Sequence, residues 1–375
     1  RHNLETLFTN LWLIKMVLYI VLTVLLLSLS FYELFCNPPA IRKRYLFYSI
    51  SFILWIVSFL RWDVGTDWDA YLGIYEDCNY ITWYEPGFIF LNRIVKNSVD
   101  EYTVLLAVLG GVLFLFQTKA IQSLSLFPLT TLFILLGTNL CNIFFVRQSV
   151  ATAIILYSVI QIEQRNLWKF LLLIAVATSI HAASISFLPA YWIYHRRFTF
   201  KQIVLAFTIS VVLGSAGGTF IWGGMGDMLG GIYAHKIDGY MEQGADATFN
   251  SGMDATTLYI RNIGGKLISL IVFLLLIGDR YKEKTRGMLN LFVFAIIMLP
   301  ITISVSPSLG RMWTPYVQLQ IFLMTYAVSS PRRLSNKMIF FTILVAMTLV
   351  RLYMKLFVDY DGEAFLPFET ILKFI

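Results

Sequence analysis

Charged residues are scarce in this sequence, and long apolar runs are abundant. Asp, Glu, Lys and Arg make up 14% of the 375 residues, whereas about 25% is usual in soluble domains. Hydrophobic residues reach 58%, and the mean hydropathy is +0.71. A soluble core of this length cannot bury so much apolar surface. The composition therefore excludes a soluble protein and predicts membrane-spanning helices, because the apolar runs are too long for barrel strands.

Signatures of nucleotide, metal and disulfide chemistry are also missing. The three cysteines, Cys36, Cys78 and Cys141, have no CxxC or metal-type spacing, and the four histidines are scattered. Neither a P-loop nor the glycine fingerprint of dinucleotide-binding folds is present. We therefore expect no metal and no ATP hydrolysis by this chain. The composition also excludes a nucleic-acid partner.

The apolar runs predict an all-α, polytopic membrane protein with about twelve transmembrane helices in a single membrane domain. Several runs are shorter than the ~20 residues that a helix needs to cross ~30 Å of hydrocarbon. Because residue 1 is Arg and Met16 opens the first span, residues 1–15 of the 1–375 domain are expected to be upstream or non-native sequence. The runs lie at 12–35, 45–60, 103–119, 127–145, 148–162, 167–180, 182–195, 202–222, 259–278, 288–305, 312–328 and 338–357.

Basic residues indicate which side of the membrane each loop occupies. They cluster in short connections at alternate positions, whereas most Asp and Glu residues fall in the other connections. The positive-inside rule makes the basic side cytoplasmic. Two long connections, 61–102 and 223–258, then face outward, where we expect the working surface because sites are often built on long loops. The second is rich in glycine and is expected to be mobile and to close over a substrate.

The first outer loop carries a candidate catalytic carboxylate, Asp67. Thr66 and Asp69 have the spacing of a helix-capping pattern, so a helix should begin here. One face of a short interfacial helix is predicted by the apolar repeat Trp68, Tyr71, Leu72 and Tyr75. Asp67 would lie in the first turn of this helix. It is either a general base or orienting carboxylate, or a solvated cap.

Farther along the same loop, Glu85 precedes a Pro-Gly pair that breaks the chain. The apolar stretch from Gly87 to Val95 is too short to cross a membrane. We expect it to dip into the outer leaflet, which would bring Glu85 to the membrane surface. Four aromatic residues of the loop either stack on sugar rings or form an interfacial belt: Trp62, Trp68, Trp83 and Tyr84.

Arg147 and Arg311 lie at the ends of apolar runs, toward the outer face in this topology. Ionisable residues in such places are costly and are therefore functional candidates. A guanidinium group can hold two phosphate oxygens at once. We favour phosphate binding because two separate arginines converge on one face; the alternative is that each pairs with an outer-loop carboxylate.

His181 divides a stretch, 167–194, that has basic residues at both ends. Each arm of ~14 residues would rise only ~21 Å, which is too short to cross the hydrocarbon. The pattern predicts a helical hairpin with His181 at its apex, below the outer surface, and Ser184 one turn beyond. His181 is either a proton acceptor or phosphate contact in an outward cavity, or a hydrogen-bonded core histidine.

Five short motifs occur in a fixed order along the chain. They are R-x-x-V-G-T-D-W-x-x-Y at 61–71, E-P-G-F-x-x-L-N at 85–92, F-x-R-Q-S-V-A at 145–151, H-A-A-S at 181–184 and G-R-x-x-x-x-Y at 310–316. Together they resemble the EpsG family of Wzy-like bacterial polysaccharide polymerases, from about residue 16 to 330. The resemblance implies a fold related to lipid-carrier-dependent membrane glycosyltransferases. It also implies an enzyme that polymerises lipid-linked oligosaccharide repeat units at the extracytoplasmic face of the bacterial plasma (inner) membrane.

This resemblance implies the partners and the roles of the site residues. Donor and acceptor would be undecaprenyl-pyrophosphate-linked oligosaccharides in the lipid bilayer, with a polysaccharide chain-length regulator as a further candidate partner. The leaving group is already activated, so no cofactor is expected. The candidate catalytic residues are Asp67, as first choice for the base, then Glu85 and His181. The candidate residues for binding the pyrophosphate are Arg147, Arg311 and Arg61. The candidate residues for binding the sugar or the acceptor are Tyr71, Trp68, Gln148 and Tyr316.

Other functions would use some of the same features. A transporter or exporter of lipid-linked or free glycans predicts two repeated halves with matching broken helices, and we find no internal repeat. A glycan ligase would use the same donor with a different acceptor, and the sequence separates it poorly from a polymerase. A membrane acyltransferase is disfavoured, since its expected intramembrane pairing of His with Asn or Asp is not evident.

Overall fold

The computed structural model describes the backbone of residues 2–231, 237–239, 241–242, 255–277, 279–306 and 308–374. The regular structure of these residues consists of α-helices and short 3₁₀ helices (η), with one isolated antiparallel bridge between Arg61 and Thr370. The predicted all-α fold is therefore confirmed. The chain divides into two compact units. Unit 1 comprises Arg1–Ile81, Ile89–Val150 and Ser335–Ile375, and unit 2 comprises Thr82–Phe88 and Ala151–Leu334.

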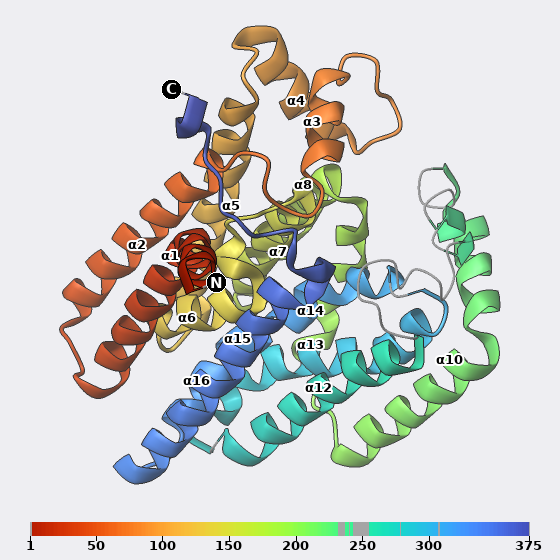
Figure 1. Cartoon of the computed structure of the whole chain (residues 1–375). Coiled ribbons are helices and arrows are strands. Elements are labelled where there is room, and N and C mark those ends of the chain that lie inside the picture. Colours follow the sequence, from red (N-terminus) through yellow and green to blue (C-terminus); the bar gives the residue numbers. More distant parts are fainter. Residues whose placement is uncertain are drawn as a thin grey trace. The chain divides into compact units, whose positions relative to one another are not determined.

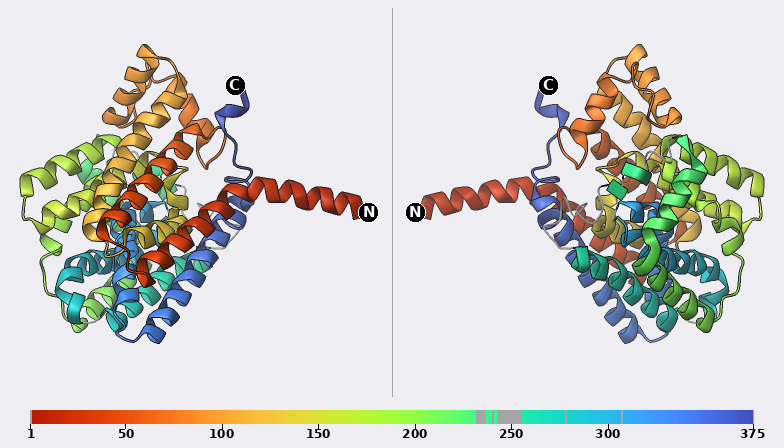
Figure 2. Two further views of the ribbon diagram at one scale, coloured as in Figure 1. Left: turned by 90° about the vertical axis from the view of Figure 1, so that its left-hand side faces the viewer. Right: turned by 90° about the vertical axis from the view of Figure 1, so that its right-hand side faces the viewer.

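Unit 1 contains the N-terminal helices and the last long helix. They are α1 (His2–Phe35), α2 (Ala40–Leu60), α3 (Trp68–Glu76), α4 (Pro86–Ser98, whose first turn belongs to unit 2), α5 (Tyr102–Leu124), α6 (Pro128–Asn139), η1 (Leu140–Asn142), α16 (Leu334–Phe357), η5 (Asp359–Gly362) and η6 (Ile371–Phe374). Figure 1 shows α1 beside α6 and α2 beside α5. Helix α16 lies beside α1 (Figure 2). The ring of Phe341 on α16 packs against those of Phe31 and Phe35 on α1.

A buried carboxylate on α1 caps the start of α6. Glu33 is buried and accepts hydrogen bonds from the backbone N–H groups of Leu129 at 3.3 Å and Thr130 at 2.8 Å. The Thr130 hydroxyl donates to the same carboxylate at 3.0 Å. Backbone N–H groups in the first turn of a helix lack intrahelical partners. Glu33 therefore supplies acceptors that the local sequence, Phe-Pro-Leu-Thr, does not.

Replacing Glu33 with alanine is expected to destabilise the protein by about 2–4 kcal/mol, because buried N–H groups would lose their acceptor. Glu33→Gln keeps one carbonyl oxygen and should cost less. The measurement is thermal unfolding in detergent, with Glu76→Ala as the control, since Glu76 is an exposed helix residue. Equal melting temperatures for Glu33→Ala and the control would contradict the capping role.

Unit 2 contains the middle of the chain. Its helices are α7 (Arg147–Glu163, whose first turn belongs to unit 1), α8 (Leu167–Ile180), η2 (Ala182–Phe187), α9 (Ala190–Ile193), α10 (Phe200–Leu229), α12 (Ala255–Leu276), α13 (Asp279–Ile303), η4 (Leu309–Trp313), α14 (Thr314–Gln318) and α15 (Gln320–Ser329). Helix α13 packs against α10, α12, α14 and α15. It therefore forms the core of this unit.

Pro300 interrupts the hydrogen-bond ladder of α13 because proline has no backbone N–H. Helix α10 supplies side-chain donors at this point: the Ser210 hydroxyl bonds to the carbonyl of Ile297, and Trp222 Nε1 donates to the carbonyl of Ile301 at 3.3 Å. Gly214 allows the close approach, since a Cβ there would lie 2.5 Å from the Pro300 oxygen. The proline is thus accommodated by a neighbouring helix, as is usual in membrane proteins.

Five helices in the described part of the chain are long and apolar enough to cross a membrane: Met16–Phe35, Ala40–Leu60, Tyr102–Leu124, Tyr281–Ile303 and Leu334–Phe357. Three shorter apolar helices accompany them: Leu167–Ile180, Ala182–Ile193 and Phe200–Ser215. The chain is a multi-pass membrane protein, as predicted. The count of about twelve spans stays a prediction, because several predicted runs form helices shorter than the ~20 residues of a full crossing.

The structure tests the predictions for the first outer loop more fully than those for the second. The predicted short helix in the first loop is present as α3, but the predicted capping by Thr66 and Asp69 is wrong. Asp67 is the N-cap residue and makes no side-chain capping bond. Thr66 lies one residue before the cap, and its hydroxyl bonds to the Asp67 carboxylate. In the second loop α10 continues to Leu229 and α12 begins at Ala255. Half of this predicted mobile cover, 232–236, 240 and 243–254, lies outside the described residues.

Candidate functional site

The segment around His181 forms the predicted helical hairpin. Helix α8 ends at Ile180, His181 has an extended backbone (φ −147°, ψ 110°), and η2 begins at Ala182. The basic ends of the two arms are tied together, because the Tyr191 hydroxyl donates to the Arg165 carbonyl at 2.9 Å. His181 therefore lies at the apex, with 18% of its side chain exposed.

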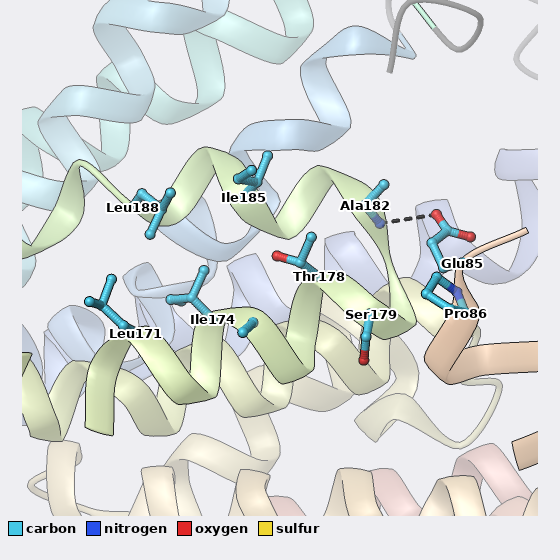
Figure 3. A pocket seen from close by; sticks show the side chains of 10 residues that line it. Glu85, Pro86, Leu171, Ile174, Thr178, Ser179, Ala182, Ile185 and Leu188 are labelled. Carbon is cyan, nitrogen blue, oxygen red and sulfur yellow. Dashed lines mark hydrogen bonds between the residues drawn. The ribbon is translucent and has the colours of Figure 1, made fainter. Parts of the chain in front are cut away.

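The carboxylate of Glu85 packs against this apex. Glu85 is 2% exposed, and its Oε1 accepts a hydrogen bond from the Ala182 N–H at 3.0 Å (Figure 3). The same oxygen lies 4.0 Å from Nδ1 of His181. A buried carboxylate is costly unless it is hydrogen-bonded or paired with a cation. A protonated His181 would be its counter-ion, so the two side chains form a carboxylate–imidazole pair.

Gly87 is the residue that lets Glu85 reach this position. A Cβ at Gly87 would lie 2.9 Å from both the Cβ and the backbone oxygen of Ser179, near the end of α8. Real Cβ atoms essentially never approach other heavy atoms so closely. The first turn of α4, which follows Glu85 directly, therefore requires glycine to pack on the hairpin.

Gly87→Ala is accordingly expected to destabilise the protein by about 1–3 kcal/mol, because the contact with Ser179 becomes overpacked. The matched control is Gly73→Ala on α3, where an added Cβ would meet nothing within 4 Å. That change should be neutral or stabilising by about 0.5–1 kcal/mol. Melting temperatures in detergent measure both effects, and a Gly87→Ala variant as stable as the control would contradict the close packing.

An apolar groove with a volume of about 450 Å³ runs along the hairpin between its two arms. One wall is a stripe of α8, and the other is one face of the segment that begins with η2 (Figure 3). Glu85 and Pro86 close one end. The lining residues are Glu85, Pro86, Leu171, Ile174, Ala175, Thr178, Ser179, Ala182, Ile185 and Leu188.

Two hydroxyl groups of the hairpin have no hydrogen-bond partner. The Oγ1 of Thr178, which lines the groove, and the Oγ of Ser184 are both buried. Most buried polar side-chain atoms in proteins do have a partner. Ser184 was expected near His181 from the sequence, whereas Thr178 was not. The sequence does contain a signal for Thr178: it is a polar residue at helical spacing from the apolar residues Leu171, Ile174 and Ala175.

Arg311 lies on η4, which packs against η2. The Ser186 hydroxyl donates to the Met312 carbonyl at 2.9 Å, and the Tyr316 hydroxyl donates to the Ser186 carbonyl at 2.8 Å. Arg311 itself is exposed. Tyr316 is fully buried and its ring packs on Phe187. Tyr316 thus fixes the segment that carries Arg311, and its hydroxyl is already bonded.

Arg61, in unit 1, is almost completely buried, with 5% exposed. One of its terminal nitrogens donates to the Phe145 carbonyl at 2.8 Å, and its guanidinium carbon lies 4.9 Å from the centre of the Phe145 ring. Its Nε has no hydrogen-bond partner, and no carboxylate of the described residues lies within 4.0 Å of it. Burial lowers the pKa of Arg61 to about 10, so the group stays charged at neutral pH.

The other predicted residues of the first outer loop surround Arg61 or follow it. Trp68 is buried, and its ring packs edge-on against Tyr102. The guanidinium carbon of Arg61 lies 5.8 Å from the centre of the Trp68 ring. Tyr71 is half-buried on the same helix, and Asp67 is exposed. The Thr66 hydroxyl donates to Asp67 at 3.4 Å. Asp67 therefore presents a solvent-facing carboxylate at the start of α3.

Arg147 and Gln148 begin α7 and are half-buried. The three residues of η1, Leu140, Cys141 and Asn142, have φ between 48° and 58°. This left-handed conformation costs of order 1–2 kcal/mol per non-glycine residue. The turn is held by a hydrogen bond from Asn142 to Gln117 at 2.5 Å. Such strain persists only where the surroundings fix it, and here it sets the direction of the chain that leads to Arg147.

The sequence-predicted residues fall into two groups. Unit 1 holds Arg61, Asp67, Trp68, Tyr71, Arg147 and Gln148, and unit 2 holds Glu85, His181, Arg311 and Tyr316. Contacts join Arg61 with Trp68 in the first group and Glu85 with His181 in the second. Within the described ranges, no three His, Cys, Asp or Glu side chains are grouped so that they could hold a metal ion.

The EpsG family model matches residues 44–370, which is most of the chain. The match includes the Glu85–His181 pair, the groove and the three candidate arginines. No curated protein and no solved structure matches the chain.

Proposed function

Because the chain belongs to the EpsG family, which is linked to exopolysaccharide biosynthesis, we propose that it is a polysaccharide polymerase. Its substrates are undecaprenyl-pyrophosphate-linked oligosaccharide repeat units, which serve as both donor and acceptor. The reaction takes place at the extracytoplasmic face of the bacterial plasma membrane, where a chain-length regulator is a candidate partner. The fold is then related to membrane glycosyltransferases that use a lipid-carrier donor.

The observation that carries this proposal is the Glu85–His181 pair at the hairpin apex. Glycosyl transfer to a hydroxyl group requires a base, and histidine is the commonest general base near neutral pH. The carboxylate 4.0 Å from Nδ1 would stabilise the imidazolium that forms when His181 takes a proton. Burial of Glu85 and its bond to the Ala182 N–H hold the carboxylate in place.

The overall reaction is a substitution at the anomeric carbon of the donor. The acceptor hydroxyl oxygen forms the new glycosidic bond, its proton passes to the base, and the bond between the sugar and pyrophosphate breaks. Undecaprenyl pyrophosphate leaves with the electron pair. Because this leaving group is already activated, we expect the reaction to need neither ATP nor a cofactor.

Cationic side chains would stabilise the negative charge that develops on the pyrophosphate. Arg311 is proposed to contact the pyrophosphate because it is exposed on η4, which packs against the hairpin. Arg147, at the start of α7, is proposed for the same role because it is an ionisable residue at the end of an apolar run. Arg61 is a further candidate, although its burial against Phe145 and Trp68 also suits a role in positioning α3.

The remaining assignments concern the acceptor and its base. Asp67 is the alternative base, because its exposed carboxylate opens α3. Tyr71, Trp68 and Gln148 are proposed to contact the sugar or the acceptor. Tyr316 is proposed to support the same contacts indirectly. Its hydroxyl bonds to the Ser186 carbonyl, and this bond would hold η2 against η4.

The experiment that tests the proposal is polymerisation by the purified protein in liposomes containing defined undecaprenyl-pyrophosphate repeat units and EDTA. We expect a ladder of lipid-linked glycans spaced by one repeat unit. Boiled protein and repeat units on a water-soluble pyrophosphate carrier serve as controls. No ladder, together with movement of the lipid-linked sugar across the sealed bilayer, would overturn the polymerase in favour of a transporter.

A further inference from the structure

We infer that the groove between α8 and η2 binds the first isoprene units of the lipid carrier, next to its pyrophosphate. This inference rests on the proposed function and names the part of the substrate that the hairpin holds. The ligand is an isoprenoid hydrocarbon chain with a polar end at the Glu85–His181 pair.

The shape of the groove follows from the two kinds of helix that form it. A 3₁₀ helix has three residues per turn, so Ala182, Ile185 and Leu188 fall on one face. An α-helix brings residues at spacings of three and four together, and the stripe on α8 follows this rule with Leu171, Ile174, Ala175 and Thr178. The small side chains of Ala175 and Ala182 leave the space that larger residues would fill.

The chemistry of the walls changes from one end of the groove to the other. Leu171 and Leu188 stand at the end away from the apex, whereas Thr178 and Glu85 stand at the apex (Figure 3). The buried Thr178 hydroxyl has no partner in the protein and can donate to an oxygen of a ligand. This polarity matches an amphiphile whose polar group lies at the apex and whose hydrocarbon runs down the hairpin.

The groove opens beside a lipid-facing surface. On α8, Leu172 is 65% exposed and Val176 is 42% exposed, directly next to the lining residues Leu171 and Ala175. An exposed apolar stripe on a membrane protein faces hydrocarbon rather than water. A chain dissolved in the bilayer can therefore enter sideways, without leaving the apolar phase.

The size of the groove limits how much of the carrier it holds. From Leu171 to Thr178 the helix rises about 10 Å, and the cavity volume of about 450 Å³ is within the range of small-ligand sites. These dimensions accommodate a few isoprene units, and the rest of an undecaprenyl chain would remain in the bilayer. Recognition would therefore depend on the units nearest the pyrophosphate.

A photoreactive probe tests the inference directly. Geranyl pyrophosphate with a diazirine on its terminal isoprene would be irradiated with the full-length protein in liposomes, and labelled peptides would be mapped by mass spectrometry. We expect labelling of 167–188, suppressed by undecaprenyl pyrophosphate and not by the same concentration of phosphatidylglycerol. Equal suppression by the phospholipid would mean that the groove is only a site for bilayer acyl chains, and labelling elsewhere would also overturn the inference.

Variants of α8 separate the groove from general effects on folding. Ala175→Phe fills the groove and should reduce labelling at least tenfold, whereas Val176→Phe puts the same phenyl side chain on the exposed face and should leave labelling unchanged. Leu171→Ala enlarges the groove and provides a second test if Ala175→Phe fails to fold. Labelling of the groove without any polymerisation would refute the proposed function alone, whereas polymerisation with labelling elsewhere would refute the groove alone.

Discussion

Glu85→Gln is expected to lower the rate of polymerisation by about 10³-fold while leaving the protein folded in the membrane. Glutamine keeps an oxygen that can accept the Ala182 N–H, so the backbone contact at the apex survives. It removes the negative charge that would stabilise a protonated His181. The measurement is the initial rate of ladder formation, with melting temperature as the check on folding.

Two further variants test whether Glu85 and His181 act together and whether Asp67 is the base instead. His181→Asn should cost about as much as Glu85→Gln, and the double variant no more than either alone, because residues that act as a unit are not additive. Asp67→Asn is the competing test, since Asp67 is the alternative base. If Asp67→Asn abolished the ladder while Glu85→Gln retained it, the carboxylate–imidazole pair would not be the catalytic base.

The hairpin could be predicted from the sequence, but the residue that completes its apex could not. Basic residues at both ends of 167–194 and arms too short to cross determined the reversal at His181. The bond from Ala182 to Glu85 joins residues separated by 97 positions. No periodic pattern links such distant positions. Glu85 and His181 could therefore each be named as candidates from the sequence, but their contact could not be predicted.

The first outer loop shows a different limit. Its apolar repeat predicted α3 correctly, because side chains three and four positions apart share a helix face. The sequence also marked Arg61 as a charge near the outer surface. Its burial against Phe145 depends on tertiary packing. The left-handed turn at Leu140–Asn142 was equally hidden, since none of its residues is glycine.

A large loss of polymerisation is also expected when the arginines proposed to bind the pyrophosphate are replaced. Arg311→Ala and Arg147→Ala should each lower polymerisation by about 10²-fold or more, because each would remove a positive charge from the leaving group. Arg311→Lys restores the charge but not the planar fork that holds two oxygens, so it should recover only part of the activity. Arg332→Ala is the matched control, because Arg332 is exposed in a basic connection assigned to the cytoplasmic side.

The location of Arg311 also predicts which kinetic quantity changes. Its segment is fixed by the bonds of Ser186 to Met312 and of Tyr316 to Ser186, neither of which involves the guanidinium. Truncating Arg311 removes neither of these bonds, and the melting temperature is the check that the segment keeps its fold. If the guanidinium acts on charge that develops as the pyrophosphate leaves, kcat should fall more than KM rises. Normal product from both Arg147→Ala and Arg311→Ala would refute the pyrophosphate assignment, whereas a rise in KM alone would make the two arginines binding residues with no role in the bond-breaking step.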